Sequence, residues 1–194
     1  MSNSRTELVN QRVSEHMSAA TKLHCACGGV LLEVEGAPIV SVECCCNSCR
    51  AAAVRLKKLE NAPAIMNDCE ATPLVLYRAD RVRFLAGADK LKEFRLSPKS
   101  GTRRVLASCC NTPVFMDVKG GHWLSLYGLL WPAKDLPALE MRTMTSDLAE
   151  PSLLPADVPN LKKQSWAFFA RLIHTWVAMR FRNPKIPVNG VINA

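Results

Sequence analysis

The sequence lacks the segments that direct a chain into or across a membrane. Residues 1–22 contain no apolar stretch of the kind found in a signal peptide. No uncharged apolar run of about 18 residues, the length that a spanning helix needs, occurs in the sequence. We therefore expect a cytoplasmic protein, in which clustered cysteines bind metal more often than they form disulfides.

The sequence also lacks the usual signatures of nucleotide-binding and hydrolytic enzymes. It contains no phosphate-binding loop, no dinucleotide-binding glycine pattern and no G-x-S-x-G motif. Aromatic residues make up only 6% of the chain, and they are not interleaved as on a base-stacking face. A zinc-ribbon-like nucleic-acid-binding protein is therefore the weakest alternative, and nucleic acid is not an expected partner.

Positive charge is what the chain does have. It carries 25 Lys and Arg against 17 Asp and Glu, which gives a formal net charge of +8. Such a balance favours acidic partners, for example anionic lipid or an anionic small molecule. Residues 78–104 hold nine of the basic residues and three acidic ones. This run predicts a solvated β face, and attraction of a small ligand's carboxylates or of nucleic-acid phosphate is the alternative.

Composition and spacing divide the chain into five parts. They are a polar lead-in at 1–20, a β-rich domain at 21–131, a proline-rich linker or wrapping loop at 132–160, a basic amphipathic helix at 161–183 and a tail at 184–194.

Alternating apolar residues predict that the domain is mainly β. Two short strands should flank the turn at Gly36-Ala37-Pro38. About six more strands follow, in the segments PLVLYRA, VRFLAG, LKEFRLS, RRVLAS, PVFMDV and HWLSLYG. Between these two groups, residues 47–60 are rich in helix-forming alanines, and Asn47 is the expected N-cap of a helix there.

The last predicted element is the basic C-terminal helix, with Asn160 as its expected N-cap. Its apolar residues recur at helical spacing and should share one face: Trp166, Phe169, Leu172, Ile173, Trp176 and Val177. Across 161–182 there are five basic residues and no acidic one. We expect this helix to pack on its own domain or to form a homo-oligomer with a second subunit. Peripheral contact with a membrane surface is the functional alternative.

Nine cysteines are the strongest chemical signal in the sequence, and eight of them are clustered. Cys25 and Cys27 precede Gly28 and Gly29, which suit the tight backbone turn that a metal-binding knuckle needs. A second group follows about 17 residues later, with Cys44, Cys46 and Cys49 in C-x-C-x-x-C spacing and Cys45 between them. Cys109 and Cys110 form the third group, and Cys69 stands alone as a buried or semi-buried thiol. Several thiolates at this spacing predict one or two Zn²⁺ ions per chain.

The order of these motifs resembles that of the glutathione-dependent formaldehyde-activating enzyme (GFA) family, which includes centromere protein V. The similar segments are CACGGVLLEV, CCCNSCR, RFLAGADKLKEFR and CCNTPV, which together span roughly residues 23–128. The resemblance implies a zinc-pinned β-tent of two small antiparallel sheets, to which the predicted C-terminal α-helix would be added. It also implies a carbon–sulfur lyase activity like that of S-hydroxymethylglutathione synthase, with a glutathione-like small thiol as partner.

The same resemblance implies two zinc sites with different roles. Cys25, Cys27 and Cys110 would hold a structural ion, with Cys109 as a candidate for the remaining ligand. Cys44, Cys46 and Cys49 would hold the working ion. Three protein thiolates leave a fourth position free for a substrate thiol or water, which is the mark of a catalytic zinc.

Two departures from the family pattern bear on these roles. The family's late C-x-x-C-G-T motif appears here with Ala107 in place of its first cysteine and Asn111 in place of glycine. Asparagine tolerates the left-handed backbone, so the turn can survive. Cys45 stands where the family often has histidine, and if it coordinated the zinc it would close the working site. In that case we expect a non-enzymatic, zinc-stapled binding module that uses its basic surface and C-terminal helix for a partner, a membrane surface or nucleic acid.

Overall fold

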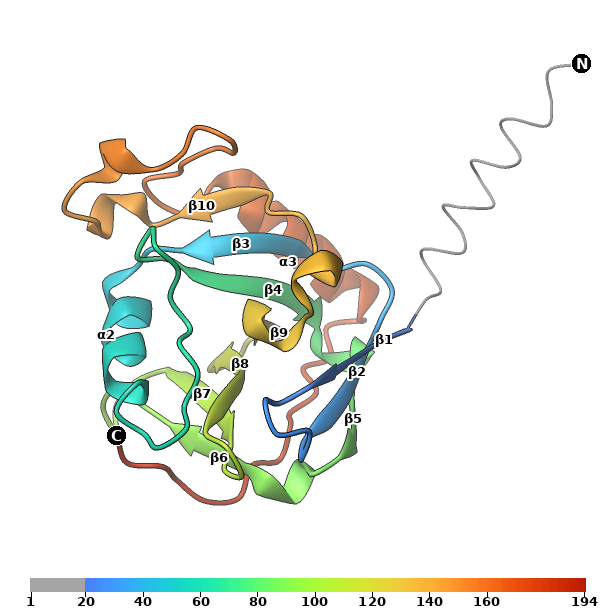
Figure 1. Cartoon of the computed structure of the whole chain (residues 1–194). Coiled ribbons are helices and arrows are strands. Elements are labelled where there is room, and N and C mark those ends of the chain that lie inside the picture. Colours follow the sequence, from blue (N-terminus) through green and yellow to red (C-terminus); the bar gives the residue numbers. More distant parts are fainter. Residues whose placement is uncertain (1–19) are drawn as a thin grey trace, which may run out of the picture.

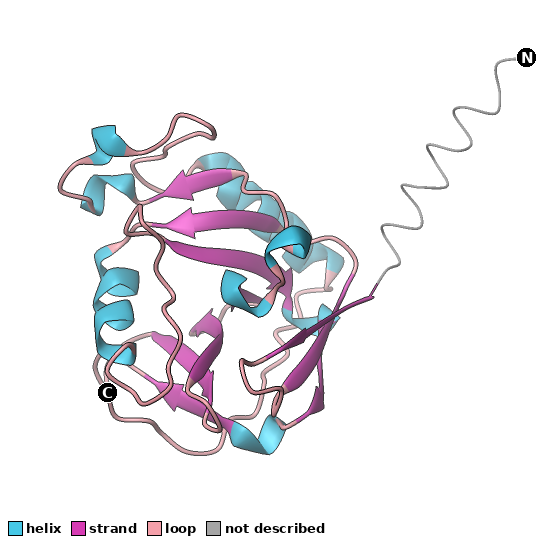
Figure 2. Cartoon of the chain, viewed as in Figure 1, coloured by secondary structure: helices cyan, strands magenta, loops and turns pink. Residues whose placement is uncertain are grey.

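The structure is a computed structural model that describes residues 20–194, and its described part is built mainly of β-strands (Figures 1 and 2). The predicted lead-in at 1–20 lies almost wholly outside the described residues. A three-stranded antiparallel sheet forms the corner near the start of the described chain, in the order β1-β2-β5. Its strands are β1 (Ala20–His24), β2 (Leu31–Glu35) and β5 (Val82–Ala86).

A second sheet has seven strands in the order β10-β3-β4-β9-β8-β7-β6. Its strands are β3 (Val40–Cys44), β4 (Thr72–Arg78), β6 (Leu91–Phe94), β7 (Thr102–Ala107), β8 (Thr112–Val118), β9 (Trp123–Tyr127) and β10 (Met141–Thr143). All pairs are antiparallel except β10 with β3, which is parallel. The prediction of a mainly β fold with two sheets and a C-terminal helix is confirmed, although this sheet is larger than the resemblance implied.

The six predicted strands of the middle section are β4 to β9. The turn at Gly36 does follow β2, but β2 and β3 then enter different sheets. Short 3-10 helices connect several elements, at Ala79–Arg81, Ala88–Lys90, Gly128–Leu130, Ala133–Asp135, Thr145–Asp147 and Pro151–Leu153.

The large sheet separates two hydrophobic cores, and strand alternation assigns side chains to each. In β4, Val75 and Tyr77 belong to the core that includes the small sheet, whereas Leu74 and Leu76 belong to the core under the helices. This is the period of two that a strand buried on both faces shows. β7 follows the same rule, with Val105 in the first core and Leu106 in the second.

Helix α2 (Asn47–Leu56) leaves the end of β3 and packs on the second core. Its buried residues recur at helical spacing: Cys49, Ala52, Ala53 and Leu56. The predicted cap is wrong by one residue, because Cys46 rather than Asn47 is the N-cap. The Cys46 sulfur accepts a hydrogen bond from the Cys49 N–H at 3.3 Å, so a thiol takes the place of the usual cap oxygen.

Residues 132–160, predicted as a linker or wrapping loop, also contribute to the sheet. Within them, β10 extends the large sheet at its β3 edge. Arg142 of β10 is buried and joins Glu43 at 2.7 Å and Asp157 at 2.6 Å. The prolines therefore interrupt this segment without detaching it from the domain.

Helix α3 (Trp166–Ala178) starts later than predicted. Ser165 is its N-cap and accepts a hydrogen bond from the Phe168 N–H at 3.1 Å. The predicted cap, Asn160, instead donates its side-chain amide to the Pro155 carbonyl at 2.9 Å. Asn and Ser cap equally well, so the sequence pattern alone did not decide between them.

The far end of α3 is also earlier than expected. Arg180 and Phe181 adopt left-handed φ angles of 52° and 59°, which end the helix before Pro184. The tail then runs back along the molecule (Figure 1), and Val191 pairs with Glu93 at the free edge of β6. This pairing covers a sheet edge that would otherwise be exposed.

Within residues 20–194, no helix is both long and apolar enough to cross a membrane. The 13 residues of α3 measure about 20 Å, well short of the roughly 30 Å of a bilayer core.

Candidate metal centres

The first cysteine cluster joins the small sheet to the large one. The sulfurs of Cys25, Cys27, Cys109 and Cys110 all lie within 4.8 Å of one another. Cys27 lies 3.6 Å from Cys25 and 3.3 Å from Cys109, and Cys109 lies 3.8 Å from Cys25 and 3.9 Å from Cys110. Zn–S bonds of about 2.3 Å in a tetrahedron place sulfurs about 3.8 Å apart, so this donor set fits zinc.

Backbone turns on both sides of the cluster bring these sulfurs together. Gly28 has φ of 74° and Asn111 has φ of 53°, so both occupy the left-handed region. The expectation that Asn111 preserves the turn is confirmed. Gly29, also predicted to suit this turn, is not among the residues with a left-handed φ. Its role is steric, because a Cβ there would lie 3.0 Å from the Cys109 sulfur.

Cys109 supplies the fourth sulfur of this cluster, and Ala107 contributes none. Ala107 itself is fully buried in the first core at the end of β7. The next turn brings the sulfurs of both Cys109 and Cys110 to the knuckle of Cys25 and Cys27. The adjacent Cys109 and Cys110 thus contribute to one donor set.

Protein groups alone already favour a thiolate in this cluster. Burial raises the pKa of Cys110, but the hydrogen bonds with Thr112 and with the Cys27 backbone outweigh it, so that the pKa falls to about 6. For Cys109, burial and the neighbouring thiol of Cys27 raise the pKa to about 12. One thiol of the four is therefore ready to lose its proton at neutral pH.

The second cluster lies where β3 ends and α2 begins. The sulfurs of Cys44, Cys46 and Cys49 lie within 4.8 Å of one another. Cys44 and Cys49 are buried, with 9% and 5% of their surface exposed, and Cys46 is half-buried. Three soft donors at this separation fit zinc or a similar cation and leave one coordination position to a non-protein ligand.

Cys46 is the thiol of this cluster that ionises most readily. Hydrogen bonds from the Cys44 and Cys49 thiols and from the N–H groups of Cys49 and Ser48 lower its pKa, despite the opposing effect of burial. Its position as N-cap adds the positive end of the α2 dipole. The same hydrogen bond to Cys46 raises the pKa of Cys44 to about 11.

Cys45 does not belong to this donor set. It is fully buried, and the group of converging sulfurs within the described chain does not include it. Its N–H donates to the Thr143 carbonyl at 3.0 Å, which fixes its backbone to β10. Burial raises the pKa of its thiol to about 11. Because Cys45 stays outside the group, an ion held by the other three thiols would keep one coordination position open.

A buried arginine accompanies the second cluster and was not predicted as part of it. Arg104 of β7 is only 1% exposed and donates to the carbonyl and hydroxyl of Ser48, at 3.0 and 2.9 Å. Ser48 stands between Cys46 and Cys49. The Arg104 Nε and Nη1 atoms have no hydrogen-bond partner within residues 20–194, and no carboxylate there forms an ion pair with the guanidinium.

An unpaired buried cation is costly, so Arg104 indicates a nearby negative charge. Zinc with three thiolates carries a net charge of −1 and would supply it. The pKa of Tyr127 responds to both groups: burial raises it, Arg104 lowers it and Cys49 raises it. Thr72, opposite Cys44 in the β3–β4 pairing, carries the one other buried side-chain polar atom without a partner in the described chain, its hydroxyl oxygen.

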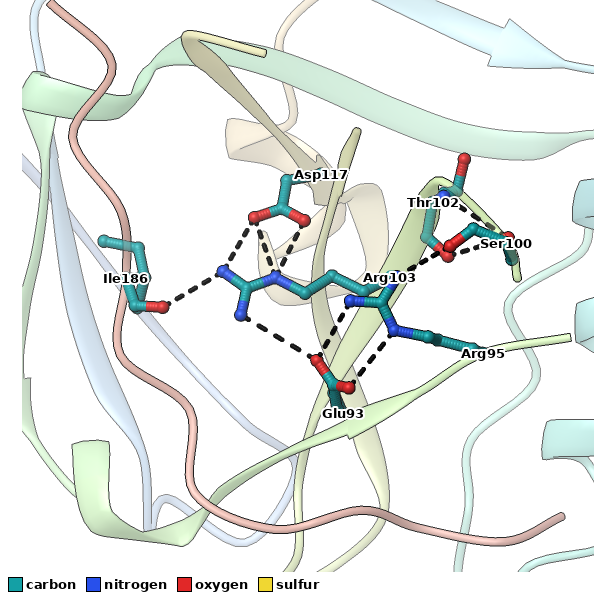
Figure 3. Close-up of polar contacts among 7 residues, drawn as sticks. All are labelled: Glu93, Arg95, Ser100, Thr102, Arg103, Asp117 and Ile186. Carbon is teal, nitrogen blue, oxygen red and sulfur yellow. Dashed lines mark hydrogen bonds and ion pairs between the residues drawn. The ribbon is translucent and has the colours of Figure 1, made fainter. Parts of the chain in front are cut away.

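The adjacent Arg103 lies on the other side of β7, because successive residues of a strand alternate. Figure 3 shows its ion-pair and hydrogen-bond partners. Arg103 binds both oxygens of Asp117, at 2.8 and 3.0 Å from its Nε, and donates to the Ile186 carbonyl at 3.0 Å. Glu93 lies 3.9 Å from it and also pairs with Arg95. The basic run at 78–104 is therefore only partly a solvated face, because several of its cations form ion pairs and Arg104 is buried.

Comparison with known proteins gives a family but no activity. A search of curated proteins found no match. Among solved structures, the chain is similar to a crystal structure of a Rhodobacter sphaeroides protein from a structural genomics programme, with 16% identity and a TM-score of 0.43, over 61% of this chain and 97% of that one. Residues 17–131, more than half of the chain, match the model of a family of unknown function. The protein therefore belongs to that family, DUF6151.

Proposed function

We propose that this protein is a zinc protein that makes and breaks carbon–sulfur bonds in adducts of a glutathione-like thiol with an aldehyde. The observation that carries the proposal is the convergence of three thiols, from Cys44, Cys46 and Cys49, with Cys45 excluded. The resemblance of the cysteine motifs to the GFA family supplies the reaction class. A cytoplasmic location, where reduced glutathione is abundant, is part of the same proposal.

The two clusters divide the work in this proposal. Cys25, Cys27, Cys109 and Cys110 hold a structural zinc, because four thiolates close a tetrahedral site. Cys44, Cys46 and Cys49 hold the working zinc. When bound there, zinc favours the thiolate form of a thiol at its fourth position.

The chain's own residues position and balance this chemistry. Cys46 is the least buried ligand of its cluster, so a substrate thiol approaches from its side. Arg104 balances the negative charge of the thiolates, and its bonds to Ser48 hold the Cys46–Cys49 turn in place. Tyr127, buried and with a raised pKa, stays neutral and adds no second negative charge.

The reaction itself needs no oxidant. A bond forms between the thiol sulfur and the carbonyl carbon of the aldehyde, and the carbonyl oxygen takes up a proton as the thiol gives one up. The reverse reaction breaks the same bond and releases both reactants.

A second candidate is the non-enzymatic, zinc-stapled binding module. The depth of the second cluster favours it, since Cys44 and Cys49 are both buried. In that case the open position would be filled by water, and the cluster would only fix the β3–α2 corner.

One set of assays separates the two candidates. The full chain is tested for zinc by elemental analysis and for accelerated exchange between glutathione, formaldehyde and their adduct by NMR. The proposal predicts two zinc ions per chain and acceleration over buffer, with one zinc and the acceleration lost in Cys46→Ser and both kept in Cys45→Ala. Zinc binding without acceleration would favour the binding module, and a folded chain without zinc would overturn both candidates.

A further inference from the structure

Helix α3 exposes large apolar side chains along one face. Trp166 is 80% exposed, Phe169 44%, and Ile173 and Val177 52% each. Their spacing of three and four residues puts them on one side of the helix, with Ala170 between them. Phe181, just beyond the helix, is 62% exposed. Single exposed apolar residues are ordinary on a protein surface, but a contiguous row of this kind marks a contact surface.

The opposite face of α3 is the one that packs on the domain. Phe168, Leu172 and Met179 are buried there. The prediction of a single apolar face that included Leu172 is therefore wrong, because α3 is apolar on both sides and the sheet covers only one.

Polar contacts hold α3 firmly in this orientation. His122 at the start of β9 is buried, and its ring nitrogen Nε2 lies 2.8 Å from the Leu172 carbonyl. The His122 ring also stacks on Trp176 at 5.6 Å. Arg171 pairs with Glu140 at 2.5 Å on the flank of the helix. The exposed row is thus presented by an anchored helix.

Positive charge borders the exposed row at both ends. Lys162 and Lys163 precede the helix, and Arg180 and Arg182 follow it, all of them exposed. The Asn183 side chain donates to the Gly120 carbonyl at 3.2 Å, which brings the turn with exposed Lys119 to the same end. No acidic residue occurs in 161–182.

The positive charge at both ends of the exposed row distinguishes between two possible partners of this face, a second copy of the chain and a lipid surface. A two-fold pairing of α3 with a second copy would use the same surface on both subunits. In either orientation, the basic ends of one helix would then meet the basic ends of the other. An anionic lipid surface complements both the apolar row and the basic residues at its ends. The acyl chains would contact the apolar side chains, and the anionic headgroups would contact the cations.

We propose that α3 is a membrane-surface anchor that lays its exposed apolar row into an anionic bilayer without crossing it. The helix lies in the plane of the interface, with Lys162, Lys163, Arg180 and Arg182 at headgroup level. This inference is independent of the proposed zinc chemistry, and the two can fail separately.

The test is vesicle flotation of the full chain, with phosphatidylcholine vesicles compared with vesicles that also contain phosphatidylserine. We expect binding to the anionic vesicles, weak or no binding to the neutral ones, and release as salt screens the charges. The double variant Lys162→Gln/Lys163→Gln should bind about 25-fold more weakly, at about fivefold for each charge removed. Ile173→Ser should weaken binding at least tenfold, through lost apolar burial.

Leu153→Ser provides the matched control, because Leu153 is 78% exposed but lies outside α3. It should bind as the unmodified chain does, and far-ultraviolet circular dichroism should show that every variant keeps its fold. Failure to bind either kind of vesicle would overturn the proposal, as would binding that Ile173→Ser leaves unchanged. A dimer in analytical ultracentrifugation that Ile173→Ser dissociates, without vesicle binding, would assign the face to a second copy instead.

Discussion

The two cysteine clusters use similar motifs but differ in number of thiols, in depth and in neighbours. The first brings four sulfurs together and joins two sheets, with Cys27 and Cys109 exposed. The second has three sulfurs at the head of α2 and a buried arginine beside them. Each cluster also belongs to a different hydrophobic core, the first through Cys25 and the second through Cys49. If both clusters hold zinc, as we propose, the four-thiol set would close its site and fasten the fold, whereas the three-thiol set beside a buried cation would leave a position for a further ligand.

Breaking the first cluster should have the largest effect. Cys25→Ser removes a buried ligand that ties the small sheet to the large one. Binding free energies of structural zinc reach about 10 kcal/mol in small zinc domains, so the variant should lose one zinc and unfold or lose most of its thermal stability. Elemental analysis and thermal unfolding check this.

Cys69→Ser is the control for that experiment, since Cys69 is half-buried and outside both clusters. It should keep two zinc ions and unfold close to the unmodified chain. If Cys25→Ser kept both ions and its stability, the first cluster would not be a structural site.

Breaking the second cluster should cost metal but leave the fold. Cys46→Ser removes a half-buried ligand at a helix cap, where serine is itself a good cap. We expect zinc to fall from two ions to one, with a change in stability of about 1 kcal/mol or less apart from the lost metal. Cys45→Ala should keep both ions. A loss of zinc from Cys45→Ala equal to that from Cys46→Ser would mean that the site is closed.

Arg104 offers a finer test of the difference between the clusters. Arg104→Met should weaken zinc binding at the second site by about 10- to 100-fold, the usual effect of removing a neighbour of the metal ligands. With the zinc removed by a chelator, the same change should alter the stability of the fold by about 1 kcal/mol or less, because the loss of the bonds to Ser48 is offset by the removal of a buried charge. Competition with a chromophoric chelator and chemical unfolding measure the two effects.

Arg103→Met is the matched control on the same strand (Figure 3). It breaks the ion pair with Asp117 and should cost about 1 kcal/mol of stability. Zinc affinity should stay within about twofold, since Arg103 lies on the other side of β7. If Arg104→Met and Arg103→Met changed the zinc affinity equally, the proposal that Arg104 balances the charge of the second cluster would be wrong.

The smallest expected effect is the dependence of folding stability on pH in the zinc-free protein. The pKa values of Cys46 and Cys110 are lowered in the fold, so between pH of about 6 and 9 the unfolded chain binds more protons there than the folded chain. Their contribution to stability therefore rises with pH over this range and is lost as pH falls. Alkylation should label Cys46 near neutral pH, whereas Cys45, with its pKa raised to about 11, stays unlabelled. A labelling midpoint of Cys46 near pH 9 would contradict this.

Much of the β-structure followed from local patterns. Alternating apolar residues predicted β4 to β9, because one or both faces of these strands are buried. The strands β1 and β10 were not predicted, since Ala20–His24 looks polar and Met141–Thr143 lies among prolines. Their pairing is decided by long-range contacts, for example that of β10 with β3.

The cysteine clusters were predictable from spacing, and the residues around them were not. Their spacing grouped Cys44, Cys46 and Cys49, but only the fold shows Cys45 outside their group. Arg104 is two residues from Leu106 in β7, so the two side chains share a face of the strand. Because Leu106 is apolar and buried, this spacing could have predicted that Arg104 faces the core. Because Arg104 lies within a run of basic residues, it was instead expected on the surface. For most arginines, charge predicts exposure better than the alternation of strand residues predicts burial.

The central claim is that one cluster is closed by four cysteines and the other is left open by three. A crystal structure of the zinc-loaded protein with anomalous scattering at the zinc edge tests it most directly. We predict two anomalous peaks, one bonded to Cys25, Cys27, Cys109 and Cys110, the other to Cys44, Cys46, Cys49 and one non-protein ligand. A single peak, or a second peak with Cys45 as its fourth ligand, would contradict the account.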